Sequence, residues 1–163
     1  MAAIPVDNPA NPHVKIATSM GDITVEVFAD EAPISAENFL KYVDEKFYED
    51  LIFHRVIKGF VIQGGGIKTN GSQKKGRRPI KLEITPKLRH WDGALSMART
   101  PDPNSATSQF YICHGAQAGL DDNYAVFGIV REGWDVVNQI ATVKTDRGDK
   151  PVSDVVIKSA TRL

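Results

Sequence analysis

The sequence predicts a mainly β protein, a closed barrel or a sandwich with two helices, and three observations lead to this fold class. Short runs rich in Val, Ile and Phe recur along the chain between clusters of Gly, Pro, Asn and Asp. Successive runs are joined by tight turns, which favours antiparallel pairing. Only two segments have the apolar spacing of a helix. The 163 residues are expected to form one domain over residues 13–163, behind a flexible, proline-containing tail at residues 1–12.

Composition and charge narrow the choice of partners and compartment. Lys plus Arg and Asp plus Glu number 20 each, so the net charge gives no argument for nucleic acid or an anionic membrane. Cys113 is the only cysteine, which excludes an internal disulfide and fits a reducing compartment. No apolar run approaches the ~20 residues of a membrane span. The N-terminal tail also lacks the basic start and apolar centre of a signal peptide. The expectation is a cytoplasmic protein without nucleic-acid or membrane partners.

The first part of the chain predicts a hairpin followed by a helix. Residues 14–18 and 23–28 alternate apolar and polar side chains around the turn sequence Met-Gly-Asp at 20–22, so each strand is expected to bury one face. Pro33 suits the first turn of a helix. The apolar residues within 39–43 then fall on one stripe, as a helix that packs on a sheet requires.

Residues 52–66 contain the most unusual pattern in the sequence. They form two short apolar runs, broken at Gly59 and stopped by three glycines. His54, Arg55 and Gln63 lie inside these runs, where a plain core strand would be apolar. An arginine is almost never fully buried unless it is paired, so Arg55 needs a partner, a cleft or a function. Strand alternation predicts that Arg55 shares a face with the apolar residues two positions before and after it, with His54 on the other face.

The remaining chain predicts more strands, a loop and a second helix. A basic cluster at residues 74–78 lies in a loop, and its simplest interpretation is a solvated surface. A helical pattern runs from Trp134 to Val143. Further strands are expected at residues 80–84, 94–98, 109–113, 125–130 and 154–160.

The sequence offers no strong metal, phosphate or nucleophile site. The four histidines are scattered, and Cys113 and His114 would point to opposite faces of a strand, so they cannot easily chelate one ion. The glycines at 64–66 match neither a P-loop nor a Rossmann fingerprint. No Gly-x-Ser-x-Gly elbow is present. Neither a metal nor a cofactor is expected, and Cys113 is interpreted as an inert apolar residue.

An arginine, glutamines and aromatic residues remain, and few reactions are served by that set alone. One is rotation about an X-Pro bond, which has a barrier of ~20 kcal/mol and no covalent intermediate. As the bond twists, the prolyl nitrogen becomes a hydrogen-bond acceptor. A guanidinium directed at this nitrogen would bind the transition state better than the planar ground state. On the residues alone, this chemistry is one hypothesis among several.

Three segments occur in the order typical of one family. They read Phe53-His54-Arg55-Val56-Ile57-x-Gly59-Phe60-x-x-Gln63-Gly64-Gly65, then Ser108-Gln109-Phe110-Tyr111-Ile112, then Val126-Phe127-Gly128. Over about residues 14–161 the chain resembles the cyclophilin family of peptidyl-prolyl cis–trans isomerases, as a single-domain member of the bacterial or archaeal kind. The resemblance implies a closed, eight-stranded antiparallel β-barrel capped by two helices, with a substrate groove on its outer surface.

By position, the resemblance implies that Arg55 is the catalytic residue. It implies that the following residues bind substrate: Phe60, Val61, Gln63, Gly71, Ala98, Arg99, Thr100, Gln109, Tyr111, Leu120 and Tyr124. The partners implied are proline-containing peptides and unfolded or folding proteins, bound by a monomer that assists folding as a chaperone does.

The chain departs from the usual residues of the family at several of these positions. Val61 stands for a more usual methionine, and Arg99 stands for an asparagine that binds substrate chiefly through its backbone. Tyr111 replaces a phenylalanine and adds a hydroxyl to an aromatic wall. The best-known members have a tryptophan where Gly119 lies and a histidine where Tyr124 lies. Cyclosporin binding depends on that tryptophan, so weak cyclosporin binding is expected.

Two alternatives to an isomerase stay open at the level of sequence. The first is a non-catalytic module that holds proline-containing segments. The second is a nucleic-acid or phosphate binder that uses the basic cluster at residues 74–78, although this cluster lacks interleaved aromatic residues. A prolyl-peptide isomerase assay separates the first alternative from the enzyme, and salt-dependent binding to oligonucleotides would reveal the second.

Overall fold

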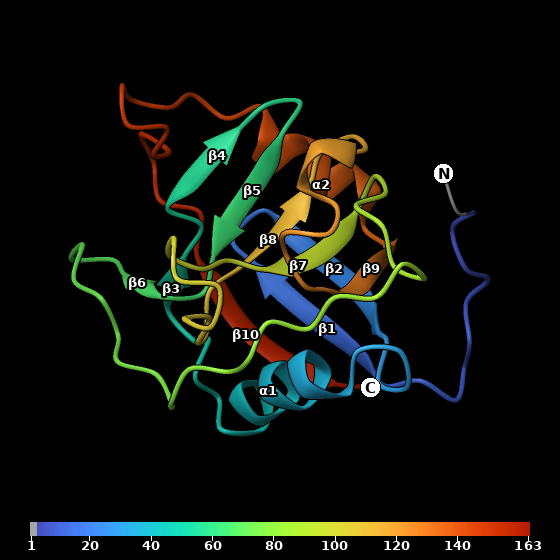
Figure 1. Ribbon diagram of the computed structural model, residues 1–163. Helices are drawn as coiled ribbons and strands as arrows, with labels where there is room; N and C mark the ends of the chain where they lie inside the picture. Colours follow the sequence, from blue (N-terminus) through green and yellow to red (C-terminus); the bar gives the residue numbers. More distant parts are fainter. Residues whose placement is uncertain (1–2) are drawn as a thin grey trace.

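The computed structural model describes residues 3–163, which form a strongly curled antiparallel sheet with two α-helices (Figure 1). The helices are α1 (Pro33–Asp44) and α2 (Trp134–Ala141), with one 3-10 turn η1 (Ala118–Leu120). The strands are β1 (His13–Thr18), β2 (Gly21–Val27), β3 (Leu51–Ile52), β4 (Arg55–Ile57), β5 (Val61–Gly64), β6 (Ile67–Lys68), β7 (Ala94–Met97), β8 (Phe110–Cys113), β9 (Val126–Glu132) and β10 (Ile157–Arg162). The expected mainly β fold with two helices is confirmed.

Within residues 3–163 the main sheet has eight strands in the order β10-β1-β2-β9-β7-β8-β5-β4, and β3 pairs separately with β6. All of these pairings are antiparallel. The predicted hairpin at the start of the chain is present, with Ile16 opposite Ile23 and Thr18 opposite Gly21. Its apolar alternation directs Val14, Ile16 and Ile23 into the core, where each is 0–1% exposed.

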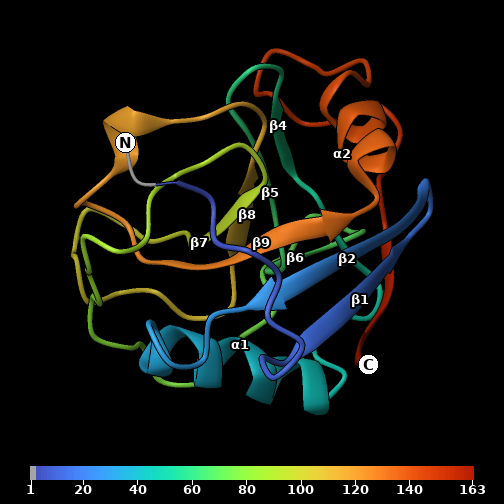
Figure 2. The same ribbon diagram turned by 90° about the vertical axis from the view of Figure 1, so that its right-hand side faces the viewer.

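The two helices lie at opposite ends of the curled sheet (Figures 1 and 2). α1 packs against β9 and β10, and α2 packs against β2, β4 and β5. Pro33 occupies the first turn of α1, as expected from its fixed φ angle. In α2 the buried residues are Val136, Val137, Ile140 and Ala141, whereas Trp134 stays 38% exposed with its ring against Gly93. The helical stripes therefore close the ends of the core.

Aromatic rings fill the core at the α1 end of the sheet. The ring of Phe39 lies 5.5 Å from that of Phe110, 5.0 Å from that of Phe127 and 5.6 Å from that of Tyr48, measured between centroids. All four side chains are at most 1% exposed. Tyr48 keeps its hydroxyl satisfied by donating a hydrogen bond to Ser108 O at 2.8 Å. The interior of the curled sheet is thus filled by packed side chains. A binding site is therefore expected on the outer face.

The sheet is not closed into a barrel, which corrects the closed barrel implied by the resemblance. β4 and β10 are its two edges and do not pair with each other. Near these edges, backbone hydrogen bonds run from Phe53 N, before β4, to Val155 O, before β10 (3.0 Å), and from Val56 N of β4 to Asp149 O in the preceding loop (2.7 Å). Residues 53 and 54, between β3 and β4, belong to no strand, so no continuous ladder forms there. The observed architecture is a half-barrel.

Residues 80–84 form no strand, contrary to the prediction. Ile80 makes one isolated bridge to Ala106. Glu83 instead accepts hydrogen bonds from two backbone N–H groups in the first turn of α1, at 3.0 and 2.9 Å. A carboxylate at this end of a helix satisfies donors that have no intrahelical partner and opposes the positive end of the helix dipole. The segment therefore serves as a cap on α1.

The predicted shared face of Phe53 and Arg55 is also wrong. Phe53 precedes β4 and is fully buried, with its ring 6.2 Å from the ring of Phe110. Arg55 is exposed at the first position of β4. Residues 53 and 54 lie outside both β3 and β4, so the alternation of one continuous strand does not apply across them. Among residues 3–163, no helix has both the length and the apolar character needed to cross a lipid bilayer.

Candidate active site

Three neighbouring strands bring Arg55, Gln63 and Tyr111 into one row. Arg55 of β4 lies opposite Gln63 of β5, and Gln63 lies opposite Tyr111 of β8. Directly opposite residues of antiparallel strands point to the same face of a sheet. Ile62 and Phe110, which alternate with them, are buried in the core. The row therefore projects from the outer, convex face.

A cavity of about 130 Å³ lies over this row, and every residue that lines it belongs to the predicted site. Its lining consists of Arg55, Phe60, Val61, Gln63, Ala98, Arg99, Tyr111, Leu120 and Tyr124. Six of these nine residues are aromatic or aliphatic, and the guanidinium and amide groups of the other three supply much of the exposed lining surface. An apolar notch with few polar groups is typical of a small-ligand or side-chain pocket.

Arg55 is exposed and has no ion pair with a carboxylate among residues 3–163. Its Nη1 lies 3.5 Å from Gln63 Oε1, a long contact. The amide nitrogen of Gln63 donates to Gln109 Oε1 at 3.0 Å, which turns the amide oxygen of Gln63 toward the guanidinium. Arg55 therefore keeps donors available for a ligand in the cavity.

The β4–β5 hairpin tip positions Phe60 at the rim of this cavity. Gly59 has a φ angle of +75°, a backbone conformation that suits glycine. Its N–H donates to His114 Nδ1 at 2.8 Å, and its carbonyl accepts from Gln117 Nε2 at 2.9 Å. His114 N in turn donates to Phe60 O at 2.9 Å. These bonds tie the hairpin tip to the loop that leads to Leu120.

A second cavity of about 160 Å³ adjoins the first, because Gln63, Ala98 and Arg99 line both. The other residues around it are Gln73, Thr100, Ser105, Thr107 and Gln109. Thr100 and Gln109 belong to the predicted site. The hydroxyl of Ser105 holds Thr100 by accepting from its N–H (2.9 Å) and bonding its hydroxyl (2.7 Å). The two cavities form one continuous groove.

Gln73, Ser105 and Thr107 were not predicted from the sequence. They lie in irregular segments, where periodicity gives no information on side-chain direction. Gly71 is the one predicted site residue that lines neither cavity. It is exposed in a turn, with a φ angle of +85° and its N–H donating to Lys68 O at 2.9 Å.

A buried polar chain lies behind the groove and was also missed by the sequence analysis. His90 is fully buried, and its Nδ1 donates to Asp121 Oδ1 at 2.9 Å. Its Nε2 therefore accepts from the hydroxyl of Tyr111 at 2.9 Å. Burial lowers the pKa of His90, against the opposing effect of Asp121, and raises the pKa of Tyr111 far above its usual value. Both side chains are neutral at physiological pH. The hydrogen bonds from Tyr111 through His90 to Asp121 connect the groove wall at Tyr111 to the residue that follows Leu120.

Arg99 and Tyr124 form the opposite wall. The guanidinium carbon of Arg99 lies 4.5 Å from the centroid of the Tyr124 ring, a cation–π contact. Tyr124 meets Tyr111 edge to face, with ring centroids 6.0 Å apart. The two tyrosines and Arg99 thus hold one another in place around the pocket.

Cys113 is the last residue of β8, the strand that carries Tyr111, but it is no nucleophile. It is fully buried, and burial raises the pKa of its thiol to about 12, with smaller contributions from Asp92 and Asp121. A thiol with this pKa carries almost no thiolate at neutral pH. Its interpretation as an inert apolar residue agrees with these values.

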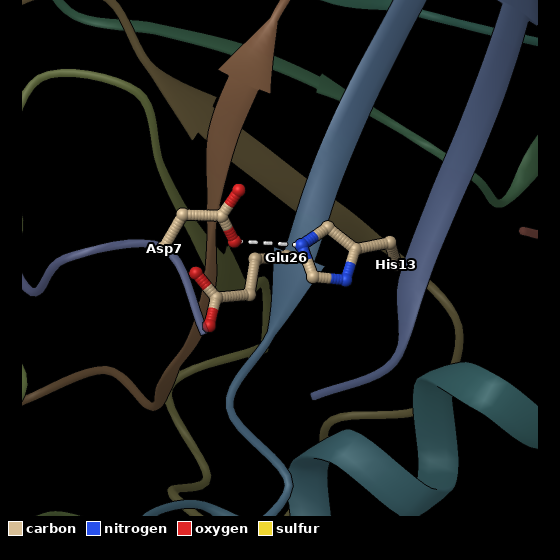
Figure 3. Close-up of side chains that lie close together, drawn as sticks. All are labelled: Asp7, His13 and Glu26. Atoms are coloured by element: carbon tan, nitrogen blue, oxygen red, sulfur yellow. Dashed lines mark hydrogen bonds and ion pairs between the residues drawn. The ribbon is translucent and has the colours of Figure 1, made fainter. Parts of the chain in front are cut away.

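Asp7, His13 and Glu26 form the one cluster among residues 3–163 that resembles a metal site, with one ligand-type atom each inside 4.8 Å (Figure 3). Arg131 already occupies it, with Nε and Nη2 at 2.8 and 2.6 Å from Glu26 Oε1. The other oxygen of Glu26 accepts two hydrogen bonds from residues 8–11, at 3.2 and 2.7 Å. The guanidinium of Arg131 thus supplies positive charge to this cluster, which is an ion-pair network.

The fold and the groove together define the class of protein. A proline ring has no N–H to satisfy, so an apolar notch suits it, and a guanidinium beside the notch offers hydrogen-bond donors. A groove of this kind on the outside of a curled antiparallel sheet, with a helix at either end, is the arrangement of a cyclophilin-type protein.

Comparisons with known proteins agree. The family described as "Cyclophilin type peptidyl-prolyl cis-trans isomerase/CLD" matches residues 13–162. A peptidyl-prolyl cis-trans isomerase of Acinetobacter baylyi is 48% identical, over 83% of this chain and 75% of its own length. Peptidyl-prolyl cis-trans isomerase B of Escherichia coli is 42% identical, over 91% of this chain and 98% of its own.

Solved structures show the same fold. The crystal structure of a cyclophilin-type peptidyl-prolyl cis-trans isomerase from Cryptosporidium parvum has a TM-score of 0.84 and 32% identity, covering 94% of this chain and 98% of its own. A second structure, determined in the presence of the dipeptide Ala-Pro, has a TM-score of 0.82 and 33% identity, covering 91% and 97%. The chain belongs to the family of cyclophilin-type peptidyl-prolyl cis–trans isomerases.

Proposed function

We propose that this chain accelerates rotation about X-Pro bonds in peptides and in unfolded or folding proteins, with Arg55 as its catalytic residue. The observation that carries the proposal is the guanidinium of Arg55, exposed at an apolar cavity and without a carboxylate partner among residues 3–163. Family membership supports the same reaction.

The mechanism follows from the electronic change during rotation. A planar X-Pro bond delocalises the nitrogen lone pair into the carbonyl, and the resulting barrier is ~18–20 kcal/mol. At the twisted transition state this lone pair is localised on nitrogen and accepts a hydrogen bond. Arg55 donates to it there and gains little from the planar ground state, so the interaction lowers the barrier. No covalent intermediate and no net proton transfer are needed.

The other groove residues position the substrate. Phe60, Val61 and Leu120 hold the proline ring, and the tyrosine walls complete the notch. Gln63 and Gln109 offer amides to the flanking peptide backbone. The remaining positions in this proposal are Gly71, Ala98, Arg99, Thr100, Tyr111 and Tyr124. Gly71 would contact only the more distant part of a bound chain, because it lines neither cavity.

The decisive experiment compares wild type with Arg55→Ala on a proline-containing tetrapeptide, by NMR exchange spectroscopy. Arg55→Ala is expected to lower kcat/KM by about 10²–10³-fold, the usual effect of removing one transition-state donor. Peptide affinity is expected to change much less. Arg55→Lys serves as the control that keeps the charge but loses the planar fork of donors. Because Arg55 is exposed, the free energy of unfolding should stay within about 0.5 kcal/mol of wild type.

The same assay distinguishes an isomerase from a protein that only binds proline-containing segments. A wild-type protein that binds the peptide without turnover would be a proline-segment binding module. Full isomerase activity in Arg55→Ala would show that the protein is an isomerase but that Arg55 is not its catalytic residue.

We further propose that cyclosporin binds weakly, because Gly119 leaves one side of the groove without an aromatic wall. Gly119 is exposed, and a Cβ built there meets no atom within 4 Å, so a larger side chain fits. Gly119→Trp is expected to tighten cyclosporin binding about tenfold or more, because a tryptophan adds a large apolar contact. Isothermal titration calorimetry on both proteins measures this. Low-nanomolar inhibition of wild type would contradict the proposed role of Gly119.

A monomeric, cytoplasmic enzyme made of residues 13–163, with residues 1–12 as an appended segment, completes the proposal. The single, buried Cys113 supports a reducing compartment. Two cations of the basic cluster are engaged within the chain, since Lys74 Nζ donates to Phe47 O at 2.8 Å and Arg77 pairs with Glu45. This engagement argues against a nucleic-acid surface at residues 74–78.

A further inference from the structure

Arg99 lies where the two cavities of the groove meet. It lines both of them, together with Gln63 and Ala98. A peptide that places its proline in the first cavity and extends into the second passes this junction within a residue or two of the proline, because each extended residue advances the chain by about 3.3–3.6 Å. A side chain close to the proline therefore passes the Arg99 guanidinium.

Contacts with the backbone and with Tyr124 hold the Arg99 head group in place. Its Nε and Nη2 donate to Asn123 O at 3.3 and 2.8 Å, and its Nη1 donates to Thr100 O at 2.9 Å. The guanidinium also stacks on Tyr124. These bonds use three of its five N–H donors. Two donors remain in a fixed geometry, and the acceptors already present are neutral, so the positive charge is not compensated.

The charge of the groove has one sign. Arg55 and Arg99 are the only charged residues among those that line the two cavities. Asp121 and Asp122, which follow Leu120 in the chain, are engaged by Arg89, at 3.7 and 2.8 Å. The whole chain has a net charge of zero, so this positive groove is a local feature.

We propose that the groove prefers prolyl segments that carry a carboxylate next to the proline, with Arg99 as the residue that determines this specificity. The inference rests on the proposed isomerase function and names its substrate class. An aspartate or glutamate side chain near the proline meets an oriented guanidinium with two unused donors. A lysine or arginine side chain at the same place meets two like charges.

The test uses peptides with blocked, uncharged termini, of the form acetyl-Ala-Xaa-Pro-Phe-amide and acetyl-Ala-Pro-Xaa-Phe-amide, with Glu, Gln or Lys as Xaa. NMR exchange spectroscopy gives kcat/KM, and chemical-shift titration of the same peptides gives Kd. In at least one series, kcat/KM for Glu is expected to exceed that for Lys by about two- to fivefold at low ionic strength, as for a partly exposed ion pair. The ratio should fall toward one in ~1 M salt.

Arg99→Gln is expected to bring the Glu-to-Lys ratio toward one. Arg78→Gln is the matched control, because it removes the same charge from an exposed residue that lines a different cavity beside α1. It should leave the ratio unchanged. Equal constants for Glu and Lys in both series overturn the proposal, and so does a ratio that Arg99→Gln leaves intact. If no peptide is turned over, the proposed isomerase function fails, while the Kd values still decide the preference.

Discussion

Tyr111 connects the groove to the interior through a single hydroxyl group. One face of its ring lines the pocket, and its hydroxyl donates to the buried Nε2 of His90. Ser96, opposite Tyr111 in the β7–β8 register, adds a second hydrogen bond to this hydroxyl. His90 is held in turn by Asp121. A phenylalanine would form the same wall, so the hydroxyl acts on stability and positioning more than on chemistry.

Tyr111→Phe is expected to destabilise the protein by about 1 kcal/mol, because it removes one donor from the buried His90 and leaves the ring volume unchanged. The Ser96 hydroxyl, 3.2 Å from the same nitrogen, limits the loss. Urea denaturation measures the free energy of unfolding, and kcat/KM should stay within a few-fold of wild type. A loss of activity above tenfold at unchanged stability would show instead that the hydroxyl contacts the substrate.

At the scale of elements, the segment before β1 is fastened to the sheet by charges. His13 Nδ1 faces Asn11 O at 2.8 Å, and His13 Nε2 faces Asp7 Oδ1 at 2.7 Å. Both partners are acceptors, so this geometry requires a doubly protonated imidazole. Burial lowers the pKa of His13, but the hydrogen bonds that its ring donates to Asp7 and Asn11 and the charges of Asp7 and Glu26 outweigh this effect, and the net pKa is raised.

The pH dependence follows from this direction. A raised folded-state pKa means that His13 stabilises the fold fully below its unfolded pKa of about 6.5, and that this contribution is lost as pH rises through the folded value. Hydrogen exchange of the residue 8–11 amides is expected to speed up between pH 6 and pH 8, beyond the intrinsic pH effect. His13→Gln is the control and should lack this additional change. Exchange that follows only the intrinsic rate in both proteins would contradict a charged His13.

The flexible tail at residues 1–12 stays a prediction. The hydrogen bonds between residues 8–11 and the buried Glu26 lead us to expect that part of this segment is held. Arg131 strengthens the attachment, since its Nη2 also donates to Pro5 O at 2.7 Å. The exchange experiment above measures this order directly.

At the scale of the whole molecule, alternate residues of a strand have different roles: those on the inner face form the core, and those on the outer face line the groove. Phe110 points inward to Phe39, while Tyr111, the next residue, points outward to the groove. Core and site thus share strands but use opposite faces. The fold stabilises the site by holding strands in register, and of the groove residues Val61 and Tyr111 are also buried in the core.

Phe39→Ala tests this separation. Removal of a fully buried ring from the aromatic cluster is expected to cost about 3–5 kcal/mol. Activity per folded molecule, measured well below the new melting temperature, should stay within a few-fold of wild type because the groove lies on the other face. Circular dichroism melts and the peptide assay provide the two readouts. A folded variant that has lost its activity would show that the core shapes the groove more directly.

Local patterns in the sequence predicted most elements, because burial on one face imposes a period that neighbouring residues reveal. The hairpin of β1 and β2, helix α1 and the strands of the groove were found in this way. The resemblance to the cyclophilin family then implied Arg55, Phe60, Gln63, Tyr111 and Leu120 as site residues, and the structure places them around one cavity.

Tertiary structure alone decided the features that depend on contacts between distant residues. The open edge between β4 and β10, the cap that Glu83 forms on α1 and the junction of two cavities at Arg99 have no local signature. His90 and Tyr111 form a hydrogen bond although they are 21 positions apart in the sequence, and Glu26 and Arg131 do so at a separation of 105. The periodicity of apolar residues in the sequence shows which face of an element a residue occupies. The residue that it contacts on that face depends on how the sheet curls.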